Sequence, residues 1–130
     1  MNPKRGSQAV ELALVTPLLL LLMTGGLDLA WYFSVDMALF NAVRDGAQYG
    51  SRTLQTVGPA LAAKNNALAT WRLGTHADVG MPTFEALLEG AAPMQVLRIH
   101  GRLAYEPLFG LVPIPVEHRT ELVVRMVEQP

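Results

Sequence analysis

The chain begins with one long apolar run. Between residues 9 and 27 the only charged side chain is Glu11, and residues 18–22 are all leucine. Nineteen helical residues span about 28 Å, which is close to the ~30 Å hydrocarbon core of a bilayer. Pro17 would break a helix in water, but it is tolerated in a membrane helix and can kink it there. The run therefore predicts a membrane-spanning helix.

Beyond the apolar run the pattern stays helical and becomes amphipathic. Three aromatic residues at 31–33 stand where an interfacial aromatic belt falls. Apolar positions then recur at steps of three and four residues, including Val35, Leu39, Val43, Leu54 and Val57. Because no proline occurs between residues 18 and 58, we predict one helix over about residues 7–57.

Small residues form a stripe on the second half of this predicted helix. They fall at four-residue intervals, at Ala38, Ala42, Gly46 and Gly50. Small side chains let another backbone approach closely, and a glycine inside a helix costs about 1 kcal/mol relative to alanine. We therefore expect close packing along this stripe, against either the protein's own sheet or another subunit.

The next segment predicts a second, shorter helix. Gly58 and Pro59 mark a turn with proline at a helix start. A helix over residues 60–73 follows, ended by Gly74, and its expected buried side contains Leu61, Leu68 and Trp71. Residues 75–93 are rich in Gly, Pro and small residues, so we expect mostly loop, with a short helix capped by Thr83 and ending at Leu88.

The C-terminal part changes to a period of two. Alternation over residues 97–105 predicts a half-buried strand whose inward side chains are Leu97, Ile99, Leu103 and Tyr105. Residues 121–127 predict a second strand. The connection over residues 106–115 is unusually apolar for a loop in water. Three roles would explain this: covering the sheet, touching the membrane surface or meeting a partner. These elements predict an α+β fold in which a long N-terminal helix packs on a small antiparallel sheet.

Composition narrows the function classes. The net charge is −1, which argues against a broad nucleic-acid-binding face, and the absence of cysteine excludes disulfides and thiolate metal sites. His76, His100 and His118 lack the short spacing of a metal site, and no phosphate loop or nucleophile elbow occurs. Arg98 and Arg102 fit a solvated sheet face. We therefore predict no enzyme, cofactor, metal or small-molecule substrate.

The charges around the apolar run predict its orientation. Lys4 and Arg5 precede it, whereas Asp28 and Asp36 follow it with no basic residue before Arg44. The positive-inside rule then places the N-terminus in the cytoplasm and the remainder outside it. Three kinds of segment fit the run: a cleaved secretory signal, an uncleaved anchor, and a prepilin-type signal cut on the cytoplasmic side.

The third alternative rests on a specific motif. Residues 5–17 read Arg-Gly-Ser-Gln-Ala-Val-Glu-Leu-Ala-Leu-Val-Thr-Pro. Gly6 with a carboxylate five residues later resembles the type IV prepilin site, where cleavage falls between Gly6 and Ser7. The fuller segment resembles the TadE-like family of Tad (Flp) pilus pseudopilins, with Leu12 where the family usually has an aromatic residue. Residues 42–49 and the C-terminal third also resemble this family.

The resemblance implies a leader over residues 1–6, a transmembrane helix over 7–30 and an extracytoplasmic pilin-like domain over 31–130. It implies a minor pilin or pseudopilin in the bacterial inner membrane, required for assembly of a Tad pilus and involved in adhesion and biofilm formation. Its expected partners are a prepilin peptidase, the major pilin, other pseudopilins and the inner-membrane assembly platform. The alternative is an uncleaved bitopic protein with a periplasmic binding domain.

Glu11 has a physical role in the prepilin interpretation. A carboxylate inside a membrane segment costs about 2.5–3.5 kcal/mol on insertion scales. After leader removal Ser7 would carry a free amine, and an opposite charge in the same or a neighbouring subunit would offset the desolvation of both groups. The simpler alternative is a glutamate that extends towards the cytoplasmic interface.

Overall fold

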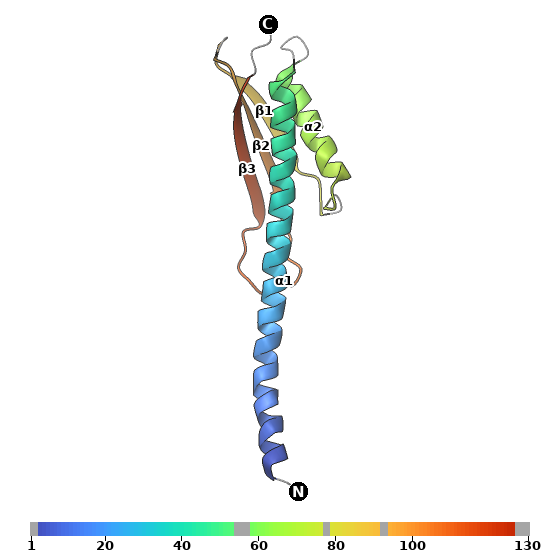
Figure 1. The fold of residues 1–130 in the computed structure, drawn as a ribbon, viewed down its shortest axis with the longest axis vertical. Coiled ribbons are helices and arrows are strands. Elements are labelled where there is room, and N and C mark those ends of the chain that lie inside the picture. Colours follow the sequence, from blue (N-terminus) through green and yellow to red (C-terminus); the bar gives the residue numbers. More distant parts are fainter. Residues whose placement is uncertain (1–2, 54–57, 77–78, 92–93, 127–130) are drawn as a thin grey trace.

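The computed structural model describes residues 3–53, 58–76, 79–91 and 94–126, with side chains from residue 8 onward. It contains two helices and three strands (Figure 1), which are α1 (Pro3–Ser51), α2 (Pro59–Leu73), β1 (Thr83–Glu89), β2 (Val96–Ala104) and β3 (Glu117–Arg125). This is the predicted α+β architecture, with a long N-terminal helix, a shorter second helix and a small antiparallel sheet.

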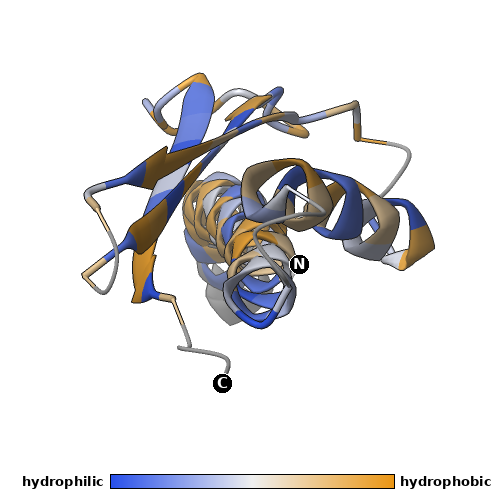
Figure 2. Ribbon diagram, turned by 90° about the horizontal axis from the view of Figure 1, so that it is seen from above, coloured by the Kyte–Doolittle hydropathy of each residue, from blue (hydrophilic) through white to orange (hydrophobic). Residues whose placement is uncertain are grey.

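The two helices lie together on one face of the sheet. Seen along α1, the sheet curves around one side of that helix and α2 lies beside it (Figure 2). α1 contacts β2 and β3, whereas α2 contacts α1, β1 and β2. Only the C-terminal half of α1 is covered in this way, and the N-terminal half extends alone beyond the rest of the molecule (Figure 1).

The sheet is a simple antiparallel meander in the order β1-β2-β3. In β2 the alternation is as predicted: Leu97, Ile99 and Leu103 are buried against the helices, and Arg102 on the opposite face is exposed. The core contains apolar side chains from both helices, from β1 and β2, and from the residues directly after β2 and β3. It comprises Val35, Leu39, Ala42, Val43, Ala47, Ala63, Ala67, Trp71, Phe84, Leu97, Ile99, Leu103, Tyr105 and Met126.

The short helix predicted over residues 83–88 is wrong. This segment is β1, and it pairs with β2 in a register that places Phe84 opposite Gly101. Its Glu, Ala and Leu residues favour a helix in isolation, but helix propensity is a weak preference that tertiary contacts override. Here Phe84 is buried in the core and the strand completes the hydrogen bonding of β2.

The predicted buried side of α2 is partly wrong. Trp71 is buried and Leu68 packs against the core, but Leu61 is exposed. The contact is made instead by Pro59, Ala63, Ala67 and Trp71. The small alanines are at the contact because α2 lies so close to α1 that a leucine at those positions would not fit.

The predicted element ends need correction. α1 begins at Pro3 rather than Ser7 and ends at Ser51, while residues 54–57 of its predicted end lie outside the described residues. β3 begins at Glu117, four residues earlier than expected, because pairing with β2 continues to Ala104. Its last predicted residue, 127, lies outside the described part of the chain.

Candidate functional site

The free half of α1 is the first candidate site. From Val10 to Leu22 its large apolar side chains are 42–75% exposed. The helix is long and apolar enough to cross a membrane, and its most apolar stretch has no residue buried inside the molecule. Glu11 is exposed within this surface. α1 continues through Pro17, and beside it the Thr16 hydroxyl donates a hydrogen bond to the Leu12 carbonyl over 2.7 Å.

The predicted processing site lies in the first turns of the same helix. Gly6 and Ser7 are both within α1, so the bond between them is helical in this structure. Positions 7 and 11 are four residues apart, which places them on one face of the helix.

The small-residue stripe packs against other residues of the same chain. A β-carbon added to Gly46 would lie 2.6 Å from the Ala63 carbonyl oxygen and 2.8 Å from the Ala67 Cβ. One added to Gly50 would lie 2.6 Å from the Ala63 Cβ. These two glycines therefore allow α1 and α2 to touch at the backbone. Ala42 is also buried, whereas Ala38, nearer the N-terminal half of α1, is partly exposed.

Asp28 forms a buried junction at the end of the domain nearest the uncovered half of α1 (Figure 1). Its residue is fully buried. One carboxylate oxygen accepts a hydrogen bond from the Phe109 backbone N–H over 2.9 Å, and the other accepts one from Leu111 N–H over 3.3 Å. Hydrogen bonds to an ionised acceptor are stronger than neutral ones. The carboxylate therefore holds the β2–β3 connection against α1.

An aromatic cluster lies one to two turns above this junction. The rings of Tyr32, Tyr105 and His118 contact one another, with centroids 4.3–5.3 Å apart. His118 is buried, and its Nδ1 lies 3.0 Å from Asp36 Oδ1. Burial, together with the charge of Asp28, raises the pKa of the Tyr105 phenol. These contacts tie β2 and β3 to α1 by side chains that no motif in the sequence relates.

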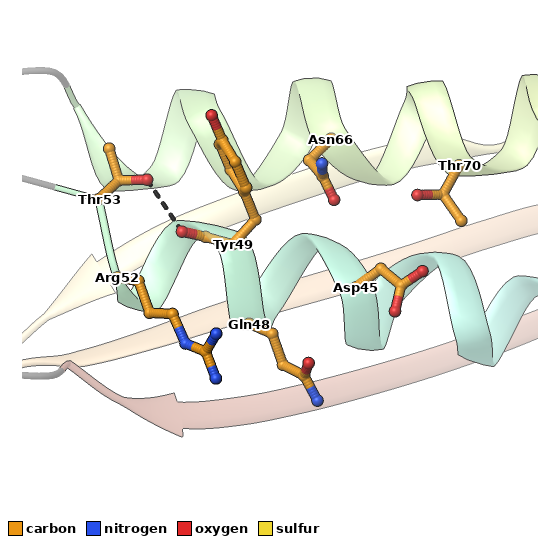
Figure 3. A pocket seen from close by; sticks show the side chains of 7 residues that line it. All are labelled: Asp45, Gln48, Tyr49, Arg52, Thr53, Asn66 and Thr70. Carbon is orange, nitrogen blue, oxygen red and sulfur yellow. Dashed lines mark hydrogen bonds between the residues drawn. The ribbon is translucent and has the colours of Figure 1, made fainter.

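A polar hollow of about 560 Å³ lies at the other end of the domain, between α1 and α2. Figure 3 shows the side chains that line it, which are Asp45, Gln48, Tyr49, Arg52, Thr53, Asn66 and Thr70. The Thr53 hydroxyl donates to the Tyr49 carbonyl over 2.9 Å. Asp45 is the one carboxylate among the lining residues that the structure describes.

The three histidines contact different side chains. His76 Nε2 lies 2.9 Å from the Ser34 hydroxyl, and His118 pairs with Asp36. Among the described residues no group of three or more His, Cys, Asp or Glu side chains is arranged to hold a metal ion. On the outer sheet face, Arg98 binds Glu89 and Glu121, and the hydrogen bonds to these carboxylates raise the pKa of the Arg98 guanidinium.

Sequence reasoning missed the role of Asp28. In the sequence Asp28 marks the end of the apolar run and supports its orientation, but an acid flanked by Leu27 and Leu29 is also a signal that a partner is nearby. The partner could not be named from the sequence, because the two backbone N–H groups lie more than eighty residues further along the chain.

A known protein family matches part of the N-terminal helix. Residues 6–48 match the family model described as TadE-like protein. This segment is TadE-like. The match confirms the resemblance seen in the N-terminal motif and ends within α1, so the likeness of the C-terminal third remains a prediction. No curated protein and no solved structure matches the chain. The TadE-like segment supports a general association with the Tad pilus.

Proposed function

We propose that this protein is a minor pilin or pseudopilin that takes part in the assembly of a Tad (Flp) pilus. The proposal rests on two features that overlap on α1. The TadE-like segment covers the same helix whose N-terminal half is apolar, uncovered and marked by Glu11. A helix of this kind serves both as a membrane anchor and as a surface for packing against identical or related helices.

The mechanism we propose is lateral docking of the helix. In the inner membrane the apolar half of α1 is surrounded by lipid, with the N-terminus in the cytoplasm and the domain in the periplasm. During assembly it moves into a growing bundle of pilin helices. Lipid and neighbouring apolar helices solvate leucine about equally well, so docking depends on close packing and on polar pairs.

Glu11 supplies the polar pair in this mechanism. Cleavage after Gly6 by a prepilin peptidase would create a free amine at Ser7, four residues from Glu11. A charge of either sign is poorly solvated in lipid, and pairing the two within or between subunits lowers that cost. Pairing between subunits would also determine how far one helix is displaced along its neighbour.

The proposal is tested first by replacing Glu11. Glu11→Ala and Glu11→Gln are expected to leave the protein in the membrane fraction, because removing a charge favours insertion. Both variants should reduce the amount of this protein in sheared pili, or the number of pili, at least several-fold. Gln8→Ala, which changes an exposed polar side chain one turn away, is the matched control and should behave as the wild type. Unchanged pili in both Glu11 variants would refute the proposed role.

Leader removal is tested by mass spectrometry of the membrane-extracted protein. The mature chain is expected to begin at Ser7, and Gly6→Asp should leave residues 1–6 attached. A wild-type protein that keeps its leader and never purifies with pili would favour the alternative, a bitopic envelope protein with a periplasmic binding domain. The proposed partners are the peptidase, the major pilin, other pseudopilins and the assembly platform, and adhesion and biofilm formation would follow from pilus assembly.

A further inference from the structure

The connection between β2 and β3 exposes apolar side chains at the membrane end of the domain. This basal loop, residues 106–116, carries four large apolar residues that are more than half exposed: Leu108, Phe109, Leu111 and Val116. Glu106 is its sole charged residue. In Figure 1 the loop lies beside the middle of α1, below the three strands. An apolar surface of this kind usually marks an interaction site.

The position of the basal loop along α1 is fixed by three contacts. Asp28 accepts hydrogen bonds from the backbone N–H groups of Phe109 and Leu111, over 2.9 and 3.3 Å. Val112 packs near Gly25, where an added β-carbon would lie 3.4 Å from its Cγ2. The loop is therefore level with residues 25–28 of the helix.

The same residues of α1 mark the outer edge of the bilayer. If the apolar run from residue 9 to residue 27 crosses the hydrocarbon core, its length of about 28 Å ends at the junction with Asp28. The exposed apolar side chains of the basal loop then lie at the boundary between acyl chains and headgroups. Leu27 and Leu29 on α1 are also exposed at this level of the helix.

We propose that the basal loop inserts its apolar side chains into the headgroup–acyl boundary of the membrane, so that the lipid bilayer is its partner. This inference rests on the membrane span in the proposed function. The loop has no basic residue, so the attraction is apolar burial rather than binding of anionic headgroups. Three prolines, at 107, 113 and 115, and the Asp28 contacts hold the loop in one shape before it meets lipid, which lowers the entropy lost on insertion.

Insertion would give the domain a second point of attachment. α1 alone would let the domain tilt and rotate on a single helix. With the basal loop also in the interface, the three-stranded sheet is held at a constant height above the bilayer. Release of the loop would then accompany removal of the helix from the membrane during assembly.

Spin labels test this directly, because the chain has no cysteine and every single-cysteine variant is free of background labelling. The full-length protein is reconstituted in vesicles of phosphatidylethanolamine and phosphatidylglycerol, with a label at position 109 (Phe109→Cys). Collision rates are measured with oxygen, which concentrates in lipid, and with a water-soluble nickel chelate. The backbone N–H that binds Asp28 is retained in this variant.

Two further labels serve as references. Leu18→Cys lies in the middle of the apolar run, and Leu61→Cys lies on α2 with an exposed fraction of 61%, close to the 53% of Phe109. Leu61 is near the α2 residues that contact Gly50, which is about 33 Å along α1 from Asp28. We expect oxygen collisions to dominate at positions 18 and 109, and nickel collisions to be several-fold more frequent at position 61. Leu108→Cys should repeat the result of position 109.

The possible outcomes distinguish failure of the loop proposal from failure of the proposed membrane span. Oxygen-dominated collisions at 18 with nickel-dominated collisions at 109 would overturn the loop proposal and leave the span intact. A label at 109 shielded from both reagents would also overturn it, because a protein surface, such as a second copy, then covers the loop. Nickel-dominated collisions at position 18 would show that the helix does not span the bilayer, and both proposals would fall.

Discussion

The contact between α1 and α2 allows a quantitative prediction at Gly50. Replacing this glycine by alanine would place a β-carbon 2.6 Å from the Ala63 Cβ, 2.7 Å from the Leu97 Cδ2 and 2.8 Å from the Pro59 carbonyl oxygen. The leucine methyl group can rotate away. The Ala63 Cβ and the Pro59 oxygen can move only if α2 shifts, so the substitution strains the packing of the two helices.

The expected magnitude combines two opposing effects. Overpacking a well-filled core costs about 1–3 kcal/mol, and replacing a helix-interior glycine by alanine returns about 1 kcal/mol. Gly50→Ala is therefore expected to lower the free energy of unfolding by about 0–2 kcal/mol. Ala63→Gly alone should lower it by about 1–2 kcal/mol, through lost helix propensity and a lost buried methyl group.

The double variant tests whether positions 50 and 63 are in direct contact. Combining Gly50→Ala with Ala63→Gly moves one methyl group from α2 to α1 and removes the 2.6 Å contact. Its destabilisation should be smaller than the sum of the two single effects by about 1 kcal/mol or more, within the range found for residues in direct contact. The clash with the Pro59 oxygen remains, so we expect partial rather than full rescue.

Thermal unfolding of the full chain in detergent micelles measures these differences. Trp71 is a suitable reporter for near-ultraviolet circular dichroism, because its ring is buried and its Nε1–H donates to the Gly80 carbonyl over 2.9 Å. For a domain of about 100 residues, 1 kcal/mol corresponds to a midpoint shift of about 4–8 °C. Gly26→Ala is the control, since nothing lies within 4 Å of its added β-carbon, and its effect should add to that of Ala63→Gly. An additive result for Gly50→Ala and Ala63→Gly would refute the close-packing argument.

Three further predictions concern the membrane end of the domain and its charges. Asp28→Ala should weaken the attachment of the basal loop by about 1–3 kcal/mol, because it leaves two partly buried N–H groups without an acceptor; hydrogen exchange should rise in residues 106–116 more than in β2. Burial raises the pKa of Tyr105 above its ordinary 10.0, so its contribution to the free energy of unfolding should be complete below pH 10 and fall as pH rises towards the folded pKa. Tyr105→Phe should abolish this alkaline loss in thermal unfolding midpoints measured over a series of pH values. The hydrogen bond from Arg119 lowers the pKa of Glu117 below 4.5, so the stabilisation by this pair should persist above pH 4.5 and disappear as pH falls through the lower folded pKa. A Glu117 pKa of 4.5 or above in an NMR titration of the carboxyl group would contradict this.

The apolar run and the strand alternation were sufficient to predict most of the fold. A period of two over residues 97–105 can bury only one face, and the structure buries the predicted side chains of β2. No residue of the run over residues 9–27 is buried by the domain, as expected for a membrane segment. These features are readable from sequence because they depend on the chemical nature of neighbouring residues and on the geometry of a single element.

Contacts between distant segments were beyond the reach of the sequence. The residues of β1 favour a helix locally, and only pairing with β2 makes them a strand. The stripe containing Gly46 and Gly50 predicted close packing, but the structure alone identifies α2 as the neighbour. Asp28 likewise meets backbone groups that any residues at positions 109 and 111 would supply. Local pattern thus determined which elements form and which faces are apolar, whereas the partners of those faces were decided by chain topology, because no residue type encodes which distant backbone it will meet.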